Sequence, residues 1–138
     1  MELLAAVAGS SEELKAHPPA YPLLEPISPL RFPRHGVDLL FETCRHRLPV
    51  PIGPMAQTGA TTVGTLAGTL AQENAEVLAG VCIVQLIGPG TPACYGGIPH
   101  VFDMRTTQLV FAGPEQALMS VAMAQMGRFY GLPVYVNV

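Results

Sequence analysis

The residues able to do chemistry are few, and they form none of the familiar catalytic motifs. The sequence contains no H-E-x-x-H, no C-x-x-C and no G-x-S-x-G, so neither a zinc hydrolase nor a serine esterase has local support. Lys15 is the only lysine and is expected on an exposed polar helix, which gives no support for Schiff-base chemistry. We therefore expect no metal site, and the sequence assigns no catalytic residue.

The remaining candidates are uncharged polar, aromatic and acidic side chains that follow predicted strands. In α/β folds, ligands collect at the carboxyl ends of the strands. The residues predicted there to bind a substrate are Gln57, Thr58, Tyr95, Phe102, Asp103 and Asn137. Such amide, hydroxyl, aromatic and carboxylate groups suit a small ligand, including a cationic one. The alternative is a structural role, with Thr58 capping a helix and Asp103 holding a loop by pairing with Arg105.

The elements that must position these residues alternate between strand and helix. Short apolar runs predict strands over 21–28, 49–55, 91–96 and 134–138, and helical periodicity predicts helices over 35–47, 62–87 and 113–130. This alternation predicts parallel strands joined by right-handed crossovers. A doubly wound sheet is disfavoured because no G-x-G-x-x-G turn follows a strand. The predicted fold is α/β, a partial (β/α)8 TIM barrel of about four consecutive β/α units, and we expect residues 1–138 to be a single segment of it.

Residues 62–87 and 97–112 each have a distinctive pattern. The helix over 62–87 is apolar but too interrupted by residues 72–76 for a membrane span, so we expect a core helix. One stripe of it is expected to face water, and its second half is expected to be buried nearly all round. The stripe consists of Thr65, Thr69, Gln72 and Glu76. Residues 97–112 show no clear period and are expected to form a long functional loop.

Composition excludes some partners and a secretory signal. The formal charge of −3 gives no basic patch, which argues against nucleic acid. Three widely spaced cysteines in apolar surroundings predict buried free thiols in a reducing cytosol, and the N-terminus lacks a basic signal-peptide region. We expect a cytoplasmic chain without membrane contact. The open edges of a partial barrel make self-association, and hence a homo-oligomer, an expectation.

Several long stretches resemble the trimethylamine methyltransferase family, including its non-pyrrolysine glycine betaine methyltransferase-like members. They are PMAQTGATTVGTLAGTLAQENAEVLAGVCIVQLIGPGTPACYGG, DMRT and GPEQALMSVAMAQMGRFYGLP, with AVAGSSEELKAHP and PISPL upstream. The resemblance covers nearly the whole chain. The sequence departs from the family pattern at Val63, where a proline commonly follows the Gly-Ala-Thr turn.

The resemblance implies a (β/α)8 barrel of which this chain would be the central part, incomplete at both ends. It also implies an activity: transfer of a methyl group from trimethylamine, or from a quaternary methylamine such as a betaine, to the Co(I) centre of a corrinoid protein. The implied partners are the methylated amine and that protein, which carries the corrinoid (cobalamin), so this segment would bind no cofactor itself. Two alternatives stay open: an unrelated TIM-barrel lyase or isomerase, and a truncated fragment without catalysis.

Overall fold

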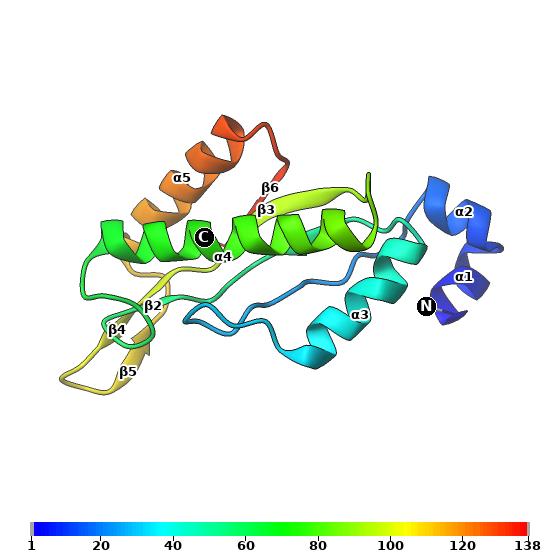
Figure 1. Ribbon diagram of the computed structural model, residues 1–138. Helices are drawn as coiled ribbons and strands as arrows, with labels where there is room; N and C mark the ends of the chain where they lie inside the picture. Colours follow the sequence, from blue (N-terminus) through cyan, green and yellow to red (C-terminus); the bar gives the residue numbers. More distant parts are fainter. Residues whose placement is uncertain (1, 138) are drawn as a thin grey trace.

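Apolar runs that alternate with helical periods fold into an α/β chain, which the computed structural model describes over residues 2–137 (Figure 1). The helices are α1 (Glu2–Ala8), α2 (Ser11–Ala16), α3 (Arg34–Arg45), α4 (Leu66–Ile87) and α5 (Pro114–Phe129). The strands are β1 (Val50–Ile52), β2 (Gln57–Thr58), β3 (Ala93–Gly97), β4 (His100–Asp103), β5 (Gln108–Val110) and β6 (Val134–Val136). The predicted α/β class and the three long helices are confirmed.

The main sheet is parallel and keeps the order of the chain. Its three strands lie in the order β1, β3, β6. Leu24 extends it by one parallel bridge to Ile52, with its N–H donating to the Pro51 carbonyl and its carbonyl accepting from Gly53. The strand predicted over 21–28 is reduced to this bridge, because prolines along it cannot donate to a ladder. Within residues 2–137 this sheet is open and not a closed barrel.

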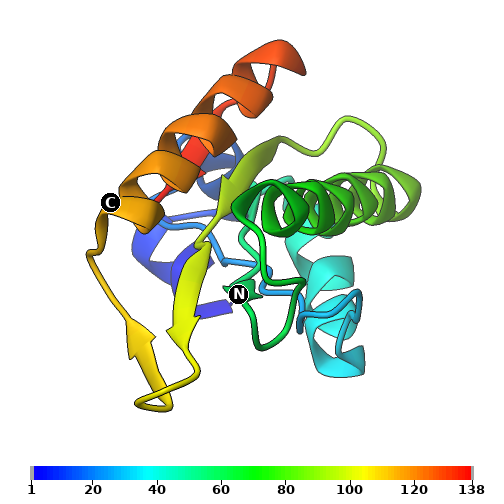
Figure 2. The same cartoon turned by 90° about the vertical axis from the view of Figure 1, so that its left-hand side faces the viewer.

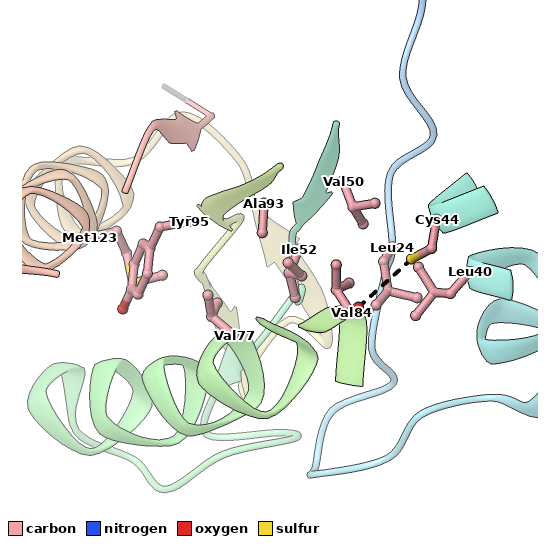
Figure 3. Packing of buried hydrophobic residues seen from close by; sticks show 10 residues of the cluster. All are labelled: Leu24, Leu40, Cys44, Val50, Ile52, Val77, Val84, Ala93, Tyr95 and Met123. Carbon is pink, nitrogen blue, oxygen red and sulfur yellow. Dashed lines mark hydrogen bonds between the residues drawn. The ribbon is translucent and has the colours of Figure 1, made fainter. Parts of the chain in front are cut away.

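Helices α3, α4 and α5 cover one face of this sheet, coloured cyan, green and orange in Figure 2. Between them lies the core, which Figure 3 shows with α4 beneath the strands. Its buried side chains are Leu24, Leu40, Cys44, Val50, Ile52, Val77, Val84, Ala93, Tyr95 and Met123. Helices α1 and α2 lie at the end of the sheet where the strands begin (Figure 1). The other face of the sheet has no covering layer of helices in the described chain.

Helix α4 is long and apolar enough to cross a membrane by length and composition, yet its buried face carries polar residues. Thr69, Glu73 and Glu76 are buried against other segments, so the prediction that Thr69 and Glu76 face water was wrong, whereas Thr65 of the same stripe is exposed. The second half is also not buried all round, since Cys82 and Leu86 are exposed. The polar residues turn inward because segments distant in sequence supply their hydrogen-bond partners.

Residues 100–110 form a hairpin, so the prediction that residues 97–112 are one long loop was wrong. Strands β4 and β5 pair antiparallel, and β4 pairs parallel with β2 in a second sheet of order β2, β4, β5. This sheet continues the main one, because the Ile98 N–H donates to the Pro54 carbonyl and the His100 N–H to the Ala56 carbonyl. Figure 1 shows the hairpin beyond the carboxyl end of β3. Pro99 and the polar turn hide the strand alternation in the sequence.

Glu73 holds the bend where β3 passes into β4. Its Oε1 accepts a hydrogen bond of 2.9 Å from the Ile98 N–H, and its Oε2 has no hydrogen-bond partner within residues 2–137. On the other side of the same residue, His100 Nδ1 lies 2.6 Å from the Ile98 carbonyl oxygen. Burial raises the pKa of Glu73 to about 9, more than the bond from Ile98 lowers it, and the neighbouring Glu76 adds to the rise. Glu73 is therefore a neutral acid at pH 7.

The close approach of α4 to β1 leads to a first prediction. A Cβ atom at Gly80 would lie 2.7 Å from Ile52 Cγ2 in the core, whereas one at Gly64 would meet nothing within 4 Å. We expect Gly80→Leu to lower the free energy of unfolding by about 1–3 kcal/mol through overpacking. Urea denaturation measures this change. Gly64→Leu is the control, and equal loss in both variants would contradict the packing account.

The buried acid leads to a second prediction. The pKa of Glu73 is raised from 4.5 to about 9 by folding, so the unfolded chain releases the proton first. The free energy of unfolding should therefore fall as the pH rises from about 4.5 to about 9, by up to ~1.4 kcal/mol per pH unit. Glu73→Gln, which stays neutral, should flatten this profile and stabilise the chain at pH 8. Urea denaturation at pH 5 and pH 8 tests it, with the exposed Glu12→Gln as control; a Glu73→Gln profile as steep as that of the unmutated chain would refute it.

Candidate functional site

Successive residues of a strand point to opposite faces, which sorts the side chains of the main sheet into two sets. Tyr95 packs among the helices, so Cys94 and Gly96 belong to the other face. Val134 lies against Gly127 of α5 and Val136 packs on the core, which leaves Tyr135 and Asn137 opposite the helices. We call the side away from α3, α4 and α5 the open face.

The Leu24 segment and β1 show the same alternation of side chains between the two faces. Ile52 lies against Gly80 of α4, while a Cβ at Gly53 would meet the side chain of Leu23, so Gly53 and Leu23 share the open face. Leu24 contacts Gly36 of α3 and therefore faces the helices. The residues that the alternation assigns to the open face are Leu23, Glu25, Gly53, Met55, Gln57, Cys94, Gly96, Tyr135 and Asn137.

A cleft of about 410 Å³ opens at the carboxyl ends of the Leu24 segment and β1. It is lined by Glu25, Pro26, Ile27, Ser28, Pro33, His35, Met55, Gln57 and Thr61. We call it the carboxyl-end cleft. A second cavity of about 220 Å³ lies between α3 and the edge of the Leu24 segment, with Leu23, Glu25, Leu39, Leu40 and Thr43 among its lining residues. The carboxyl-end cleft also reaches Met55, Gln57 and Thr61, which follow β1, so it lies at the ends of two parallel segments, where ligands of α/β folds bind.

Glu76 of α4 fixes the walls of the carboxyl-end cleft. Its carboxylate accepts hydrogen bonds from Ser28 Oγ at 2.7 Å and from the Leu30 N–H at 2.8 Å. Gln72 donates 3.0 Å to Glu76 Oε1 and 3.2 Å to the Thr61 carbonyl. One helix turn thus holds both the 28–30 loop and the segment after β2, so the cleft is built by contacts distant in sequence.

Gln57 is the one predicted binding residue that lines this cleft. Its backbone is engaged, because its N–H donates to Thr61 Oγ1 at 2.9 Å and its carbonyl accepts from the N–H groups of residues 60–62. Its side-chain amide makes no hydrogen bond to the described residues 2–137. A ligand in the cleft could therefore use both its donor and its acceptor.

Thr58 points away from the cleft toward the helices. Its hydroxyl shares a hydrogen bond of 2.7 Å with Thr69 and lies 3.9 Å from Met119 Sδ. The alternative role predicted for it, a helix cap, falls instead to Thr65, whose Oγ1 accepts from the Gly68 N–H at 3.2 Å. Thr58 thus ties β2 to α4.

Tyr95 also faces the helices and is fully buried. Its hydroxyl donates to Asn74 Oδ1 at 2.7 Å, and its ring stacks on Tyr130 with 5.8 Å between centroids. Burial is the main cause that raises the pKa of Tyr95, with smaller contributions from Tyr130 and Glu73. In this chain the ring therefore joins α4 and α5 to β3.

Phe102 and Asp103 end β4, which pairs with β2, so Phe102 lies two residues beyond His100, the partner of Gln57. Phe102 pairs with Leu109 across the hairpin. Asp103 is exposed, and its Oδ1 accepts a 2.8 Å bond from the Arg105 N–H, which lowers its pKa. The predicted alternative, a loop-holding pair with Arg105, thus occurs through the backbone and not the guanidinium.

The structure brings Gln57 and Asn137 onto one face but does not gather all six predicted residues. Binding by any of them stays a prediction. The sequence interpretation passed over Glu25, Met55 and Tyr135, which share that face. The strict alternation of Val134, Tyr135, Val136 and Asn137 could have indicated Tyr135. Within residues 2–137 there is no group of three metal-ligating side chains.

Comparison with known proteins gives the chain its relatives. The model of the trimethylamine methyltransferase (MTTB) family matches residues 1–137. The chain is 37% identical over 133 residues to glycine betaine methyltransferase of Desulfitobacterium hafniense strain Y51, covering 96% of this chain and 28% of that protein. It is 38% identical over 128 residues to trimethylamine methyltransferase MttB of Methanosarcina barkeri strain Fusaro, covering 93% and 26%.

A third relative, trimethylamine methyltransferase MttB of Desulfitobacterium hafniense strain DCB-2, is 33% identical over 136 residues, which cover 99% of this chain and 27% of that protein. The chain therefore spans only about a quarter of the length of these relatives. Because the family model covers nearly every residue, and because relatives in two genera agree with it, the chain belongs to the trimethylamine methyltransferase (MTTB) family.

Proposed function

We propose that the chain is part of a methyltransferase that removes a methyl group from trimethylamine or from a quaternary methylamine such as a betaine. The observation that carries the proposal is the family match over residues 1–137. The carboxyl-end cleft adds support, because it offers a free amide at the end of a parallel strand. The activity belongs to a polypeptide of the relatives' length that contains this chain, called the full-length protein below.

We further propose that the chain is a sector of a (β/α)8 barrel with about four β/α units. A doubly wound sheet reverses its strand order and carries helices on both faces. Here the Leu24 segment, β1, β3 and β6 follow one another in chain order, with α3, α4 and α5 on one face (Figure 2). This arrangement supports a barrel in which the open face lines the interior. In the full-length protein, further strands would close it.

The chemistry needs little from the protein beyond positioning. A methyl group on a positively charged nitrogen leaves behind a neutral amine, so the nitrogen is a good leaving group. A Co(I) corrinoid on a separate protein would supply the nucleophile that accepts the methyl group. The residues of this chain would exclude water from the ammonium group and orient it. Gln57 and Asn137, whose amides can donate hydrogen bonds, would hold the carboxylate tail of a betaine.

The proposed function is tested by methyl transfer in the full-length protein. It should demethylate trimethylamine or glycine betaine only in the presence of a corrinoid protein reduced to Co(I). The assay follows the loss of Co(I) absorbance together with the demethylated amine. The same corrinoid protein held as Co(II) is the control, and turnover without any corrinoid would exclude the mechanism.

The role of Gln57 gives a separate prediction. Gln57→Leu removes the donor for a carboxylate tail, so binding of glycine betaine should weaken about tenfold, or ~1.4 kcal/mol. Binding of tetramethylammonium, which has no tail, should not change. Isothermal titration calorimetry measures both, with the exposed Gln125→Leu on α5 as control. Equal weakening for both ligands would mean that Gln57 does not contact the tail.

A further inference from the structure

The cleft-lining residue Gln57 is held by a series of hydrogen bonds that begins on helix α4. The Gln57 N–H donates to Thr61 Oγ1 at 2.9 Å, so the position of Thr61 helps to set that of Gln57. The Thr61 carbonyl in turn accepts a hydrogen bond of 3.2 Å from Gln72 Nε2. Gln57 and Thr61 line the carboxyl-end cleft, whereas Gln72 does not. Gln72 therefore supports a wall of the cleft from outside it.

The carboxylate of Glu76 sets the orientation of the Gln72 amide. Gln72 Nε2 donates a hydrogen bond of 3.0 Å to Glu76 Oε1. Because a carboxylate only accepts hydrogen bonds, the NH2 end of the amide, and not its oxygen, must face Glu76. The second N–H of the same nitrogen is then available for the Thr61 carbonyl. Glu76 is 1% exposed, so water does not compete for its end of this arrangement.

The same carboxylate also holds the turn formed by residues 27–31. Glu76 accepts hydrogen bonds from Ser28 Oγ at 2.7 Å and from the Leu30 N–H at 2.8 Å. Backbone bonds of 2.8 and 3.1 Å between Ile27 and Arg31 close the turn, so its residues keep their relative positions. Ile27 and Ser28 line the carboxyl-end cleft. One buried side chain therefore joins this turn to the cleft-lining segment after β2.

We propose that Gln72, oriented by Glu76, is a positioning residue for ligand binding by Gln57, an inference that rests on the proposed function. A side chain that binds a ligand has to be held within about 0.5 Å of its productive position. Without the Gln72 bond, the turn after β2 keeps only its hydroxyl bonds to Thr69 on the helix side, among the contacts of the described residues. The amide of Gln57 would then be held less accurately, although nothing that touches the ligand has been removed.

The test is a double-mutant cycle between Gln57 and Gln72 in the full-length protein, with glycine betaine binding measured by isothermal titration calorimetry. Gln72→Leu should weaken binding about fivefold. In protein that already carries Gln57→Leu, the same change should weaken binding by less than about twofold, because the group that Gln72 positions is absent. Tetramethylammonium, which has no carboxylate tail, should bind to all of these variants equally.

Gln85→Leu is the matched control. Gln85 lies on the same helix and holds a loop in the same way, with Nε2 donating to the Thr91 carbonyl at 2.8 Å and Oε1 accepting from the Gly90 N–H at 2.9 Å. This loop lies at the amino end of β3, away from the cleft. Gln85→Leu should therefore leave the binding of both ligands unchanged, whereas a purely structural role of Gln72 would make the two variants alike.

A second pair of variants keeps the test decisive if Gln72→Leu does not fold. Thr61→Val keeps the volume of the side chain and removes the oxygen that accepts from the Gln57 N–H, so glycine betaine binding should weaken about fivefold. Thr61→Ser restores this acceptor and should bind within about twofold of the unmutated protein. Equal binding by Thr61→Val and Thr61→Ser would overturn the inference.

The outcomes separate this inference from the proposed function. Additive losses in the cycle, or equal weakening of both ligands by Gln72→Leu, overturn the positioning role even when methyl transfer is observed. The inference is also overturned if glycine betaine does not bind, or if Gln57→Leu binds it as tightly as the unmutated protein does. If the cycle gives the expected pattern but no methyl transfer to a Co(I) corrinoid protein occurs, the proposed function fails and the positioning role stands.

Discussion

The buried polar stripe of α4, formed by Thr69, Glu73 and Glu76, is the interaction on which the rest of the structure depends. Each residue holds a different segment at the carboxyl end of the sheet. Thr69 bonds Thr58 of β2, Glu73 bonds the Ile98 bend, and Glu76 bonds the 28–30 loop. Strands this short make few backbone hydrogen bonds to their neighbours, so the contacts from α4 are needed to fix the positions of their ends. One helix therefore positions three segments that are far apart in sequence.

This arrangement has an electrostatic constraint. Glu73 and Glu76 lie one turn apart on the buried face, and two carboxylates there would repel each other. Burial and the nearby Glu76 raise the pKa of Glu73, so one of the two groups is neutral. The ionised form of Glu73 would also add negative charge beside Tyr95, whose pKa is raised mainly by burial and less by Tyr130 and Glu73. The helix face can carry three polar groups because only part of its possible charge is present.

The sequence predicted the large elements and missed what depends on distant partners. Helical periodicity located α3, α4 and α5, because a packed helix needs an apolar stripe of its own. Thr69 and Glu76 were predicted to face water because Thr58, Ser28 and Leu30, which bond them, are not visible in the local pattern. A polar stripe can face inward whenever such partners exist.

The residues of the candidate site were also harder to predict than the helices, because their positions depend on packing that the local sequence does not show. Ranking residues by their position after a strand selected Tyr95 and Gln57 alike, although the two point to opposite faces of the sheet. Position after a strand indicates which end of the sheet a residue occupies, whereas its face depends on its parity within the strand and on where the helices pack. The face that a residue occupies can therefore be assigned only when one buried residue of the same strand is known.

The two faces of the main sheet differ in how their polar side chains are bonded. On the helix face, hydroxyl, amide and carboxyl groups bond one another or the backbone, as Tyr95 does with Asn74 and Thr58 with Thr69. On the open face, the side-chain amide of Gln57 makes no hydrogen bond to the described residues 2–137, and it lines the carboxyl-end cleft. A ligand of this chain would therefore meet more unused hydrogen-bonding groups beside Gln57 than on the helix face, where the polar groups already bond one another.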